Sequence, residues 1–396
     1  MTTKIRVAFT LFGDGNWTGG INYLRNLFTA INSTPGNRVE PVLFVSPDTD
    51  QDIINFLQLY LNEPPIVVDG WKNTKKNKFR QLFEKGLLQC DKQSLMAFQL
   101  ANIDAVFQND RWYGFRFPLP TLAWIADFQH RHLSDMFTYY RRKKRDLAYA
   151  MLCKSSTQVM VSSNDAAKDC EMFFSVPTEK ISVVPFAVQL DESVLSVEPS
   201  EVIQTYNLPD RYFYFPGQLW QHKNHLALLE ALSLLKEQGD NVVVVASGNP
   251  KDGRSEKYPA RVLEFISEKE LSENFIFLGM LPYQHIMPLM RGSVAVINPS
   301  LFEGWSTIVE EAKALGVPML LSDLAVHSEQ APKVCRFFDP LKPQEIADVM
   351  KESWQEWEAG PRYEIERSAF VEYNQKRLVF AQEFEAVVDE IVKKNV

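Results

Sequence analysis

The sequence predicts an α/β protein built from two doubly wound domains. The chain has 396 residues, which is more than one hydrophobic core usually organises, since domains typically hold ~100–200 residues. Short apolar runs alternate with longer amphipathic segments along nearly the whole chain, a pattern typical of parallel strands joined by helices. Apolar residues make up 45% and charged residues 23%, which indicates an ordinary globular protein rather than a disordered or fibrous one.

The first domain is predicted for residues 1–190. It opens with a strand at Ile5–Leu11, followed by a glycine-rich loop and an amphipathic helix at Ile21–Ile31. The glycines of that loop are Gly13, Gly15, Gly19 and Gly20. Further strands are expected at Val42–Val45, Ile66–Val68, Ala105–Phe107, Leu122–Ile125, Val159–Val161 and Ile181–Val184. Helix-length segments separate most of these runs, so the strands should be parallel.

The second domain is predicted for residues 205–374, after an aperiodic stretch beyond Pro185 that we interpret as the linker. Strands are expected at Tyr212–Phe215, Val242–Ala246, Phe275–Leu278, Val294–Ile297 and Met319–Leu321. Helices are expected to begin near Lys223, Lys257, Tyr283 and Trp305. A last helical segment runs from about Arg362 to Lys394, and its end, residues 375–396, is expected to pack back on the first domain.

This layout predicts where ligands bind. An open α/β sheet binds ligands beyond the carboxyl ends of its strands, so two such domains facing each other are expected to enclose a central cleft. The net charge of −8 argues against a nucleic-acid partner, because phosphate backbones are bound by clustered lysine and arginine.

Composition also suggests a compartment. The cysteines show no paired spacing, which predicts neither a zinc site nor a disulfide framework and indicates a reducing environment. They are Cys90, Cys153, Cys170 and Cys335. No signal-type leader and no transmembrane-length apolar run is expected, so a cytoplasmic location is predicted. Contact with the inner face of the membrane stays open, because the basic runs at 72–80 and 141–145 fit either solvated helix faces or attraction to anionic lipid.

The most informative segment is Asn298–Pro318, where a buried strand runs through a loop into a helix. Glu303 lies in the loop and Glu311 about two turns into the helix, a spacing that lets both carboxylates line one side of a ligand. The amides near Ser306 and Thr307 open the helix and offer an anion site for a diphosphate. In the alternative interpretation Glu303 caps the helix and Glu311 is a surface residue. Because Glu310 is adjacent, the spacing alone also leaves the register open.

Two further segments carry glycines next to a predicted helix start. In Phe213–His225 a strand ends at Gly217, and Lys223 near the helix start is positioned to neutralise a diphosphate, unless it is a plain surface lysine. The pair Gly19 and Gly20 would let the backbone approach a phosphate or sugar closely, although a tight turn explains the pair equally well.

At these residues the sequence resembles the family-four retaining glycosyltransferases, which have the GT-B fold, and the resemblance spans nearly the whole chain. The family's two glutamates, separated by seven residues, match Glu303 and Glu311 and favour Glu311 over Glu310. The flanking EEAKALGVPMLLSD also resembles the family's helix and following strand. The resemblance implies that Glu303 contacts the hydroxyls of the donor sugar, that Glu311 contacts those of the ribose, and that Lys223 binds phosphate.

The sequence departs from the family pattern at two places. The arginine expected directly after Gly217 is replaced by Gln218, which removes one of two expected positive charges. The His-Asp pair expected at the end of a central strand reads Ala126-Asp127. His130 and His132 lie a few residues on, and one interpretation is that they serve the same acceptor-side region. For His130, a hydrogen-bonded structural histidine is the competing interpretation.

Together the residues and the resemblance give a predicted site. The catalytic candidates are Lys223, Glu303, Asp127 and His130. The donor-binding candidates are Gly19, Gly20, Gly217, Gln218, Lys223, Glu303, Gly304, Trp305, Ser306, Thr307 and Glu311. Trp220, His222 and Asn249 are expected to border the donor pocket. No metal site and no obligatory cofactor is expected, and no Asp-x-Asp metal motif occurs in a suitable place.

The resemblance implies a function in which a sugar moves with retention from a nucleotide-diphosphate donor to a glycan, a lipid-linked or another hydroxyl acceptor. Surface polysaccharide or glycoconjugate synthesis is the expected setting. Two alternatives stay open: a catalytically weak partner that binds a nucleotide sugar or glycan, and an epimerase or inverting transferase on the same fold. A dinucleotide oxidoreductase is disfavoured, because GDGNWTGG does not place its glycines in the expected register. The donor base, the sugar, the acceptor and the oligomeric state are not predicted.

Overall fold

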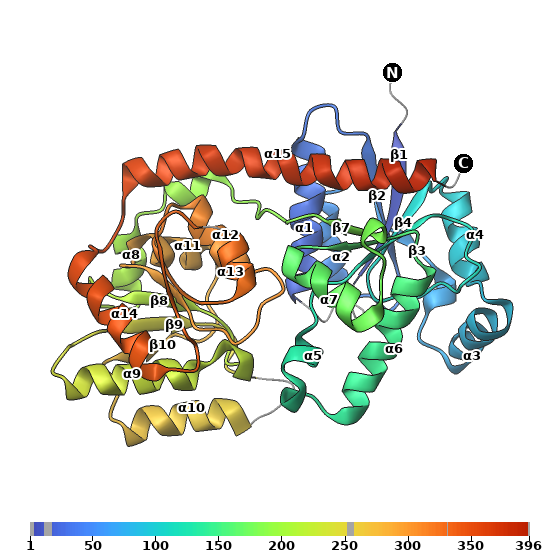
Figure 1. Ribbon diagram of the computed structural model, residues 1–396. Helices are drawn as coiled ribbons and strands as arrows, with labels where there is room; N and C mark the ends of the chain where they lie inside the picture. Colours follow the sequence, from blue (N-terminus) through green and yellow to red (C-terminus); the bar gives the residue numbers. More distant parts are fainter. Residues whose placement is uncertain (1–3, 12–17, 252–256, 331, 395–396) are drawn as a thin grey trace. The chain divides into compact units, whose positions relative to one another are not determined.

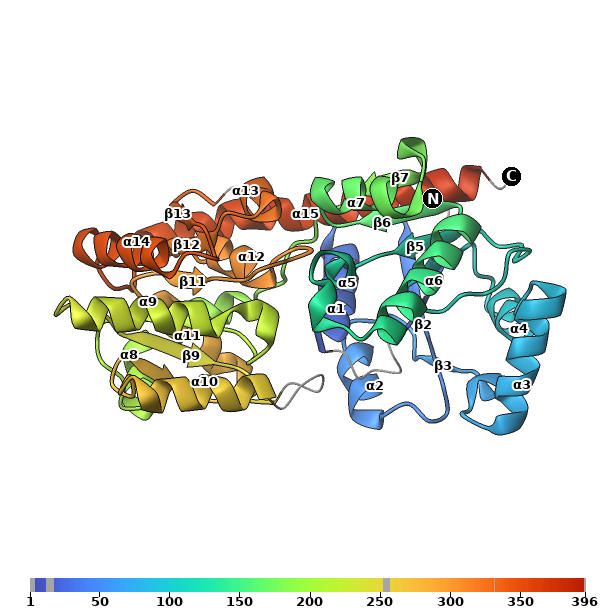
Figure 2. The ribbon, with the colours of Figure 1, turned by 60° about the horizontal axis from the view of Figure 1, so that its bottom comes forward.

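The structure is a computed structural model that describes residues 4–11, 18–251, 257–330 and 332–394. The chain divides into two compact units. The N-terminal unit contains residues 1–189 and 376–396, and the C-terminal unit contains residues 190–375. In each unit, helices cover a parallel sheet (Figures 1 and 2).

The sheet of the N-terminal unit has seven strands in the order β3-β2-β1-β4-β5-β6-β7. The strands are β1 (Ile5–Thr10), β2 (Val39–Val45), β3 (Ile66–Val67), β4 (Ala105–Gln108), β5 (Thr121–Trp124), β6 (Gln158–Val161) and β7 (Ile181–Val183). Its helices are α1 (Thr18–Ser33), α2 (Gln51–Gln58), η2 (Asp69–Trp71), α3 (Lys75–Phe83), η3 (Glu84–Leu88), α4 (Lys92–Leu100), α5 (Gln129–His132), η4 (Ser134–Met136), α6 (Tyr139–Ser155), α7 (Asn164–Phe174) and η5 (Thr178–Lys180). Neighbouring strands pair in parallel, for example β1 with both β2 and β4.

The sheet of the C-terminal unit has six strands in the order β10-β9-β8-β11-β12-β13. The strands are β8 (Phe213–Pro216), β9 (Val244–Ser247), β10 (Phe275–Phe277), β11 (Val296–Asn298), β12 (Met319–Ser322) and β13 (Cys335–Phe338). Its helices are η6 (Glu192–Leu195), α8 (Pro199–Thr205), η7 (Gln221–Lys223), α9 (His225–Glu237), α10 (Lys257–Glu268), α11 (Tyr283–Gly292), α12 (Thr307–Ala314), α13 (Ala325–Gln330), α14 (Pro343–Glu356) and the first part of α15 (Tyr363–Lys393). The predicted fold class, two doubly wound parallel α/β domains, is confirmed.

The central strands are short and buried along their whole length, as expected for a parallel sheet with helices on both faces. Side-chain oxygens cap several helices of the N-terminal unit. Thr74, Asp91, Thr138 and Ser163 each accept a hydrogen bond from an amide in the first turn of the following helix. Such caps satisfy amides that have no partner inside the helix, which fixes where each helix begins.

The helix α15 belongs to both units. Its first part is held in the C-terminal unit by a buried ion pair, in which Arg291 Nε lies 2.8 Å from Glu366 Oε2. Its last part lies in the N-terminal unit, where Arg38 pairs with Glu385 and Asp389 at 2.8 Å each. In that unit Phe380, Ala381, Phe384, Val388 and Ile391 are almost fully buried.

Some expectations about single elements were wrong in detail. Helix α1 begins at Thr18 rather than at Ile21, so Gly19 and Gly20 lie in its first turn and not in a loop before it. Glycine weakens a helix mainly in its interior, where its backbone freedom is lost, so it is tolerated in the first turn. Gly13 and Gly15 lie outside the described residues. The edge strand β13 was not predicted, because its side chains are mostly half-exposed and form no clear apolar run.

Candidate functional site

The C-terminal unit places two polar loops at the centre of its sheet. The strand order reverses between the neighbours β8 and β11, and ligands in such sheets bind beyond the carboxyl ends of the strands at this reversal. The chain leaves β8 at Pro216 and β11 at Asn298. The two segments that carry the predicted motifs, 217–224 and 299–306, therefore start at adjacent strand ends.

Lys223 and Glu303 meet across these two loops. Lys223 Nζ donates a hydrogen bond to Glu303 Oε1 at 2.6 Å. The backbone joins the loops as well, since the amide of Leu301 donates to the carbonyl of His222 at 2.8 Å. The structure thus brings together two residues that the sequence placed 80 positions apart.

Hydrogen bonds at Glu303 fall on one of its two oxygens. Oε1 lies 2.7 Å from Ser300 Oγ and 3.5 Å from Asn298 Nδ2, in addition to Lys223 Nζ. Within the described parts of the chain, Oε2 accepts no hydrogen bond, and two of the three N–H groups of Lys223 donate none. Glu303 does not cap α12, which begins after Ser306.

The carboxyl of Glu303 stays ionised despite its burial. Burial alone would raise the pKa of Glu303, but the charges of Lys223 and His222 and the hydrogen bond from Lys223 act more strongly and lower it to about 2. A carboxylate that remains charged can accept hydrogen bonds from hydroxyl groups without competition from its own proton.

The two adjacent glutamates of α12 differ in their surroundings. Glu310 is fully buried, and its carboxylate accepts hydrogen bonds from Gln330 Nε2 at 2.9 Å and from Tyr373 Oη at 2.7 Å. Lys313 Nζ lies 3.3 Å from it. Glu311 is only partly buried, and its charge raises the pKa of Tyr214 on β8, after the larger effect of burial. The fold therefore uses the Glu310 carboxylate internally.

The start of α12 is partly occupied by the protein itself. The amide of Ser306 donates to Gln330 Oε1 at 3.2 Å, and Gln330 Nε2 donates back to the carbonyl of Ser306 at 2.9 Å. The Ser306 amide, predicted to face a diphosphate, is therefore engaged by α13. Thr307 is exposed at the first position of the helix, and Gly304 and Trp305 lie in the loop that leads into it.

The loop after β8 approaches the loop after β9 closely. Gly217 N donates to the carbonyl of Ser247 at 2.7 Å. A Cβ on Gly248, which has φ +151°, would lie 2.3 Å from the carbonyl oxygen of Gly217, so only glycine fits there. Gln218 follows, and its Oε1 is buried without a hydrogen-bond partner among the described residues.

His327 was not predicted as part of the site. It is fully buried on α13, and its Nδ1 lies 2.8 Å from the carbonyl oxygen of Ser322, so Nδ1 carries the proton and donates. Its Nε2 is buried with no hydrogen-bond partner in the described chain. Burial lowers the pKa of His327, against the opposing charge of Glu303. A single histidine in SDLAVHSEQ gave no spacing signal that would have found it.

The candidates Asp127 and His130 are engaged within the N-terminal unit. Asp127 Oδ1 accepts hydrogen bonds from Arg145 at 3.0 Å and from the amide of Gln129 at 2.9 Å. His130 is fully buried, with Nε2 3.0 Å from Asp146 Oδ1 and its ring against Tyr149. No part of the His130 ring reaches the surface, which favours the structural interpretation of this histidine, and its role toward the acceptor stays an untested prediction.

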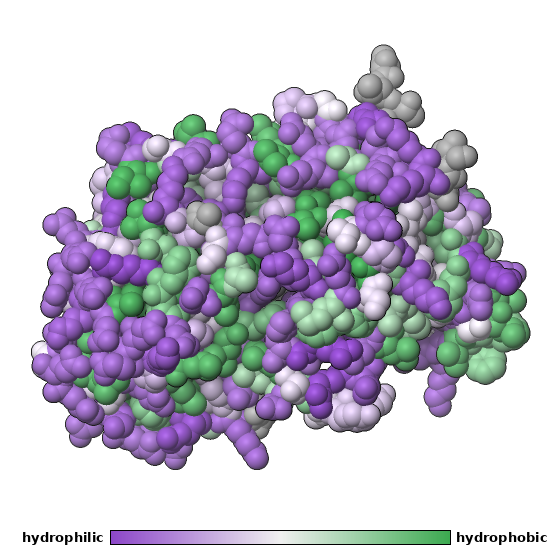
Figure 3. All heavy atoms as spheres, in the orientation of Figure 1, coloured by the Kyte–Doolittle hydropathy of each residue, from purple (hydrophilic) through white to green (hydrophobic). Residues whose placement is uncertain are grey.

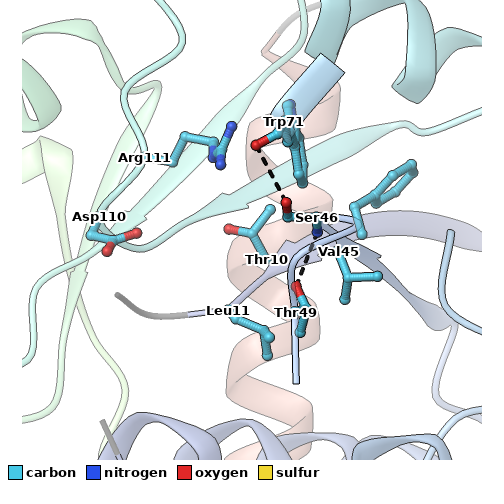
Figure 4. A pocket seen from close by; sticks show the side chains of 9 residues that line it. Thr10, Leu11, Val45, Ser46, Thr49, Trp71, Asp110 and Arg111 are labelled. Atoms are coloured by element: carbon cyan, nitrogen blue, oxygen red, sulfur yellow. Dashed lines mark hydrogen bonds between the residues drawn. The ribbon is translucent and has the colours of Figure 1, made fainter. Parts of the chain in front are cut away.

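The N-terminal unit has a pocket at the carboxyl ends of β1, β2 and β4 (Figure 4). It holds about 330 Å³ of space, part of which is open to solvent. Figure 4 shows Arg111 pointing toward Trp71, and the guanidinium carbon lies 4.0 Å from the centre of the indole ring. One nitrogen of Arg111 is buried without a hydrogen-bond partner among the described residues. Thr10, Leu11, Phe44, Val45, Ser46, Thr49 and Asp110 complete the lining.

No group of three or more histidine, cysteine, aspartate or glutamate side chains in the described part of the chain is arranged to hold a metal ion. None of its helices combines the length and the apolar character that crossing a membrane requires.

One protein family matches most of the C-terminal unit. Residues 200–377, somewhat less than half of the chain, match the family described as glycosyl transferases group 1. The matched segment contains Lys223, Glu303 and Glu311.

Curated relatives carry related names. The chain is 26% identical over 214 residues to the UDP-Gal:alpha-D-GlcNAc-diphosphoundecaprenol alpha-1,3-galactosyltransferase of Escherichia coli, covering 51% of this chain and 53% of that protein. It is 24% identical over 190 residues to the O-antigen chain mannosyltransferase RfbU of Salmonella typhimurium, covering 48% and 49%. The matches thus span about half the length of these relatives.

Solved structures match over almost the full length. A glycosyltransferase from Rickettsia africae superposes with a TM-score of 0.70 at 16% identity, covering 99% of both chains. The HepE protein of Anabaena in complex with UDP superposes with a TM-score of 0.68 at 16% identity, covering 98% of this chain and 100% of that one. At this identity the likeness concerns the fold, which is GT-B.

Proposed function

We propose that this protein is a glycosyltransferase that takes a sugar from a nucleotide-diphosphate donor and transfers it to a hydroxyl of a glycan or lipid-linked acceptor. The observation that carries the proposal is the Lys223–Glu303 pair at the strand reversal of a unit that matches the group 1 glycosyl transferases. The family resemblance supports retention of the anomeric configuration. The names of the Escherichia coli and Salmonella relatives support a role in surface polysaccharide synthesis.

In this proposal each polar group has a separate task. The two N–H groups of Lys223 that the described chain leaves unused bind the diphosphate and stabilise it as it leaves. Glu303 Oε2 accepts hydrogen bonds from the sugar hydroxyls, and Oε1 stays occupied by Ser300, Asn298 and the lysine. Glu311 contacts the ribose, a role that Glu310 cannot take because its carboxylate is buried in the fold.

The acceptor is assigned to the N-terminal unit. The pocket at the ends of β1, β2 and β4 combines hydroxyl groups with Asp110 and Arg111, which suits a polar, hydroxyl-rich group. We place no substrate contact on His130. Asp127 retains a supporting role, because it holds Arg145 beside Tyr149.

The first prediction concerns the lysine. Lys223→Ala is expected to lower turnover by about 10²–10³-fold, the loss typical for one preorganised group that stabilises developing charge. A donor is first found by a thermal-shift screen of UDP-, GDP-, dTDP- and ADP-sugars, because a ligand that binds only the folded state raises its stability. Turnover is then measured with that donor.

Lys333→Ala is the matched control, since Lys333 lies in the same unit with its side chain 76% exposed. Turnover of Lys223→Ala within about twofold of the parent enzyme would reject the assigned role. Analysis of the product anomer tests retention separately, because an inverted product would leave the lysine result intact while excluding the retaining mechanism.

A second candidate function is a nucleotide-sugar or glycan-binding partner with weak catalysis. Two residues favour this second function. Gln218 stands where the resembling family has an arginine, and Ala126 stands where it has a histidine. Donor hydrolysis and transfer assays on the purified chain separate the two: a partner binds the donor in the thermal-shift screen without turning it over.

A further inference from the structure

Helix α3 and the π-helix η3 that follows it present their apolar side to solvent. Phe79, Leu82, Phe83 and Leu87 are exposed by 73%, 72%, 48% and 70%. Their spacing of three, four and eight residues from Phe79 places them on one face of a continuous helical segment. Figure 3 shows apolar side chains gathered at the right-hand edge of that view, over α3.

The polar face of the same segment binds the protein. Arg80 Nη2 donates to the carbonyl of Gly70 at 2.7 Å, and Lys85 Nζ lies 3.4 Å from the buried carboxylate of Asp91. Glu84 is also buried and accepts a hydrogen bond from the amide of Lys92 at 3.0 Å. An amphipathic helix on a globular protein normally turns its apolar face to the core. Here the orientation is reversed.

The surroundings of this face are strongly basic. Residues 71–100 contain seven lysine and arginine residues and two acidic residues, in a chain whose net charge is −8. The two acids, Glu84 and Asp91, are buried. The exposed charges therefore include Lys75, Lys76 and Lys78 in the first turns of α3, with no exposed acid in this stretch to balance them.

We propose that the exposed face of α3 and η3 docks on an anionic lipid bilayer. Helices that lie in the membrane interface typically carry phenylalanine and leucine on one face, with lysines beside it. Each lysine near an anionic surface adds to the attraction. A stable protein partner is less well matched, because such interfaces usually involve about 20–30 residues on each side, whereas this face offers four apolar side chains.

The docking face is coupled to the pocket of the N-terminal unit. Gly70, whose carbonyl holds Arg80, precedes Trp71, which lines the pocket and stacks on Arg111. A bilayer bound to α3 would therefore be connected to the acceptor pocket through the short helix η2, which contains both Gly70 and Trp71. This link to a lipid-linked acceptor rests on the proposed function, whereas bilayer binding itself does not.

Co-sedimentation of the full chain with vesicles tests the proposal. We expect the protein to sediment with vesicles that contain phosphatidylglycerol in addition to phosphatidylcholine, and to bind phosphatidylcholine alone much more weakly. A triple variant with Lys75→Glu, Lys76→Glu and Lys78→Glu should bind the anionic vesicles about 100-fold or more weakly, because each lysine near an anionic surface contributes about 1 kcal/mol of attraction. Phe79→Ser, Leu82→Ser and Leu87→Ser combined should weaken it by at least about 10-fold.

Matched controls separate this face from general charge attraction. The triple variant R141E/K143E/K144E on α6 makes the same charge change in the same unit and should bind within about threefold of the parent. Leu263→Ser is the control for the apolar variant, because Leu263 is also an exposed leucine, with 55% of its surface accessible, but lies on α10. It should leave vesicle binding unchanged. Circular dichroism and thermal unfolding show whether each variant folds.

Three results would overturn the proposal: failure of the parent protein to bind the anionic vesicles, equal losses from the α3 and α6 charge variants, or unchanged binding of the folded apolar triple variant. Vesicle binding without any sugar transfer would instead uphold the bilayer face and reject the proposed function. The two proposals therefore fail independently.

Discussion

At the residue scale, the charge of Lys223 is already balanced within the protein. Glu303 lies 2.6 Å away, so the pair presents little net charge to an incoming diphosphate, and a second cation would matter more than it would beside a lone lysine. The position that could supply it holds Gln218, whose Oε1 has no hydrogen-bond partner among the described residues. Gln218 is therefore the residue where added charge should have the largest effect.

Gln218→Arg is expected to tighten binding of the donor nucleotide by about 10–100-fold, since a hydrogen bond to a charged group contributes about 1.5–3 kcal/mol. Titration calorimetry with the nucleotide found in the thermal-shift screen measures this. Gln221→Arg is the control, because Gln221 is exposed in the same loop. Equal affinities for all three proteins would show that Gln218 does not face the phosphates.

At the element scale, α12 carries one structural and one functional carboxylate. Glu310→Gln is expected to lower the free energy of unfolding by about 2–4 kcal/mol, because Gln330, Tyr373 and Lys313 all donate toward that buried group. Glu311→Gln should change stability by less than about 0.5 kcal/mol and weaken nucleotide binding by about 10-fold. Urea unfolding and calorimetry on both variants measure the two effects. A reversal of the two outcomes would reassign the register.

The elements also show what the sequence could predict. Strands β1 to β12 were predictable, because each contains a short apolar run between turn or helix signals. The edge strand β13 was not, since its half-exposed side chains satisfy no burial pattern. The contact between Lys223 and Glu303 needed the strand order, which depends on pairing between distant segments. The burial of His130 depends on packing against Tyr149 and Asp146, which no local spacing encodes.

At the scale of the whole molecule, the N-terminal unit depends on a segment from the other end of the chain. The centre of the Phe384 ring lies 6.1 Å from the centre of the Phe9 ring and 5.9 Å from that of the Phe107 ring. Phe384→Ala is expected to destabilise this unit by about 3–5 kcal/mol. Val379→Ala, on the same helix with its side chain 46% exposed, should cost less than about 0.5 kcal/mol. Urea unfolding of both variants measures the two losses of stability. Coinciding midpoints of unfolding would contradict the predicted difference.

The division of α15 between the units has a consequence for synthesis on the ribosome. Domains usually fold in the order in which they are made. Residues 190–375 form a unit that is complete once Gln375 has emerged. The unit that begins at the N-terminus needs residues 376–394 to fill its core, so it is expected to reach its final state last, although its translation starts first. Until then its unfinished apolar surface is a target for chaperones.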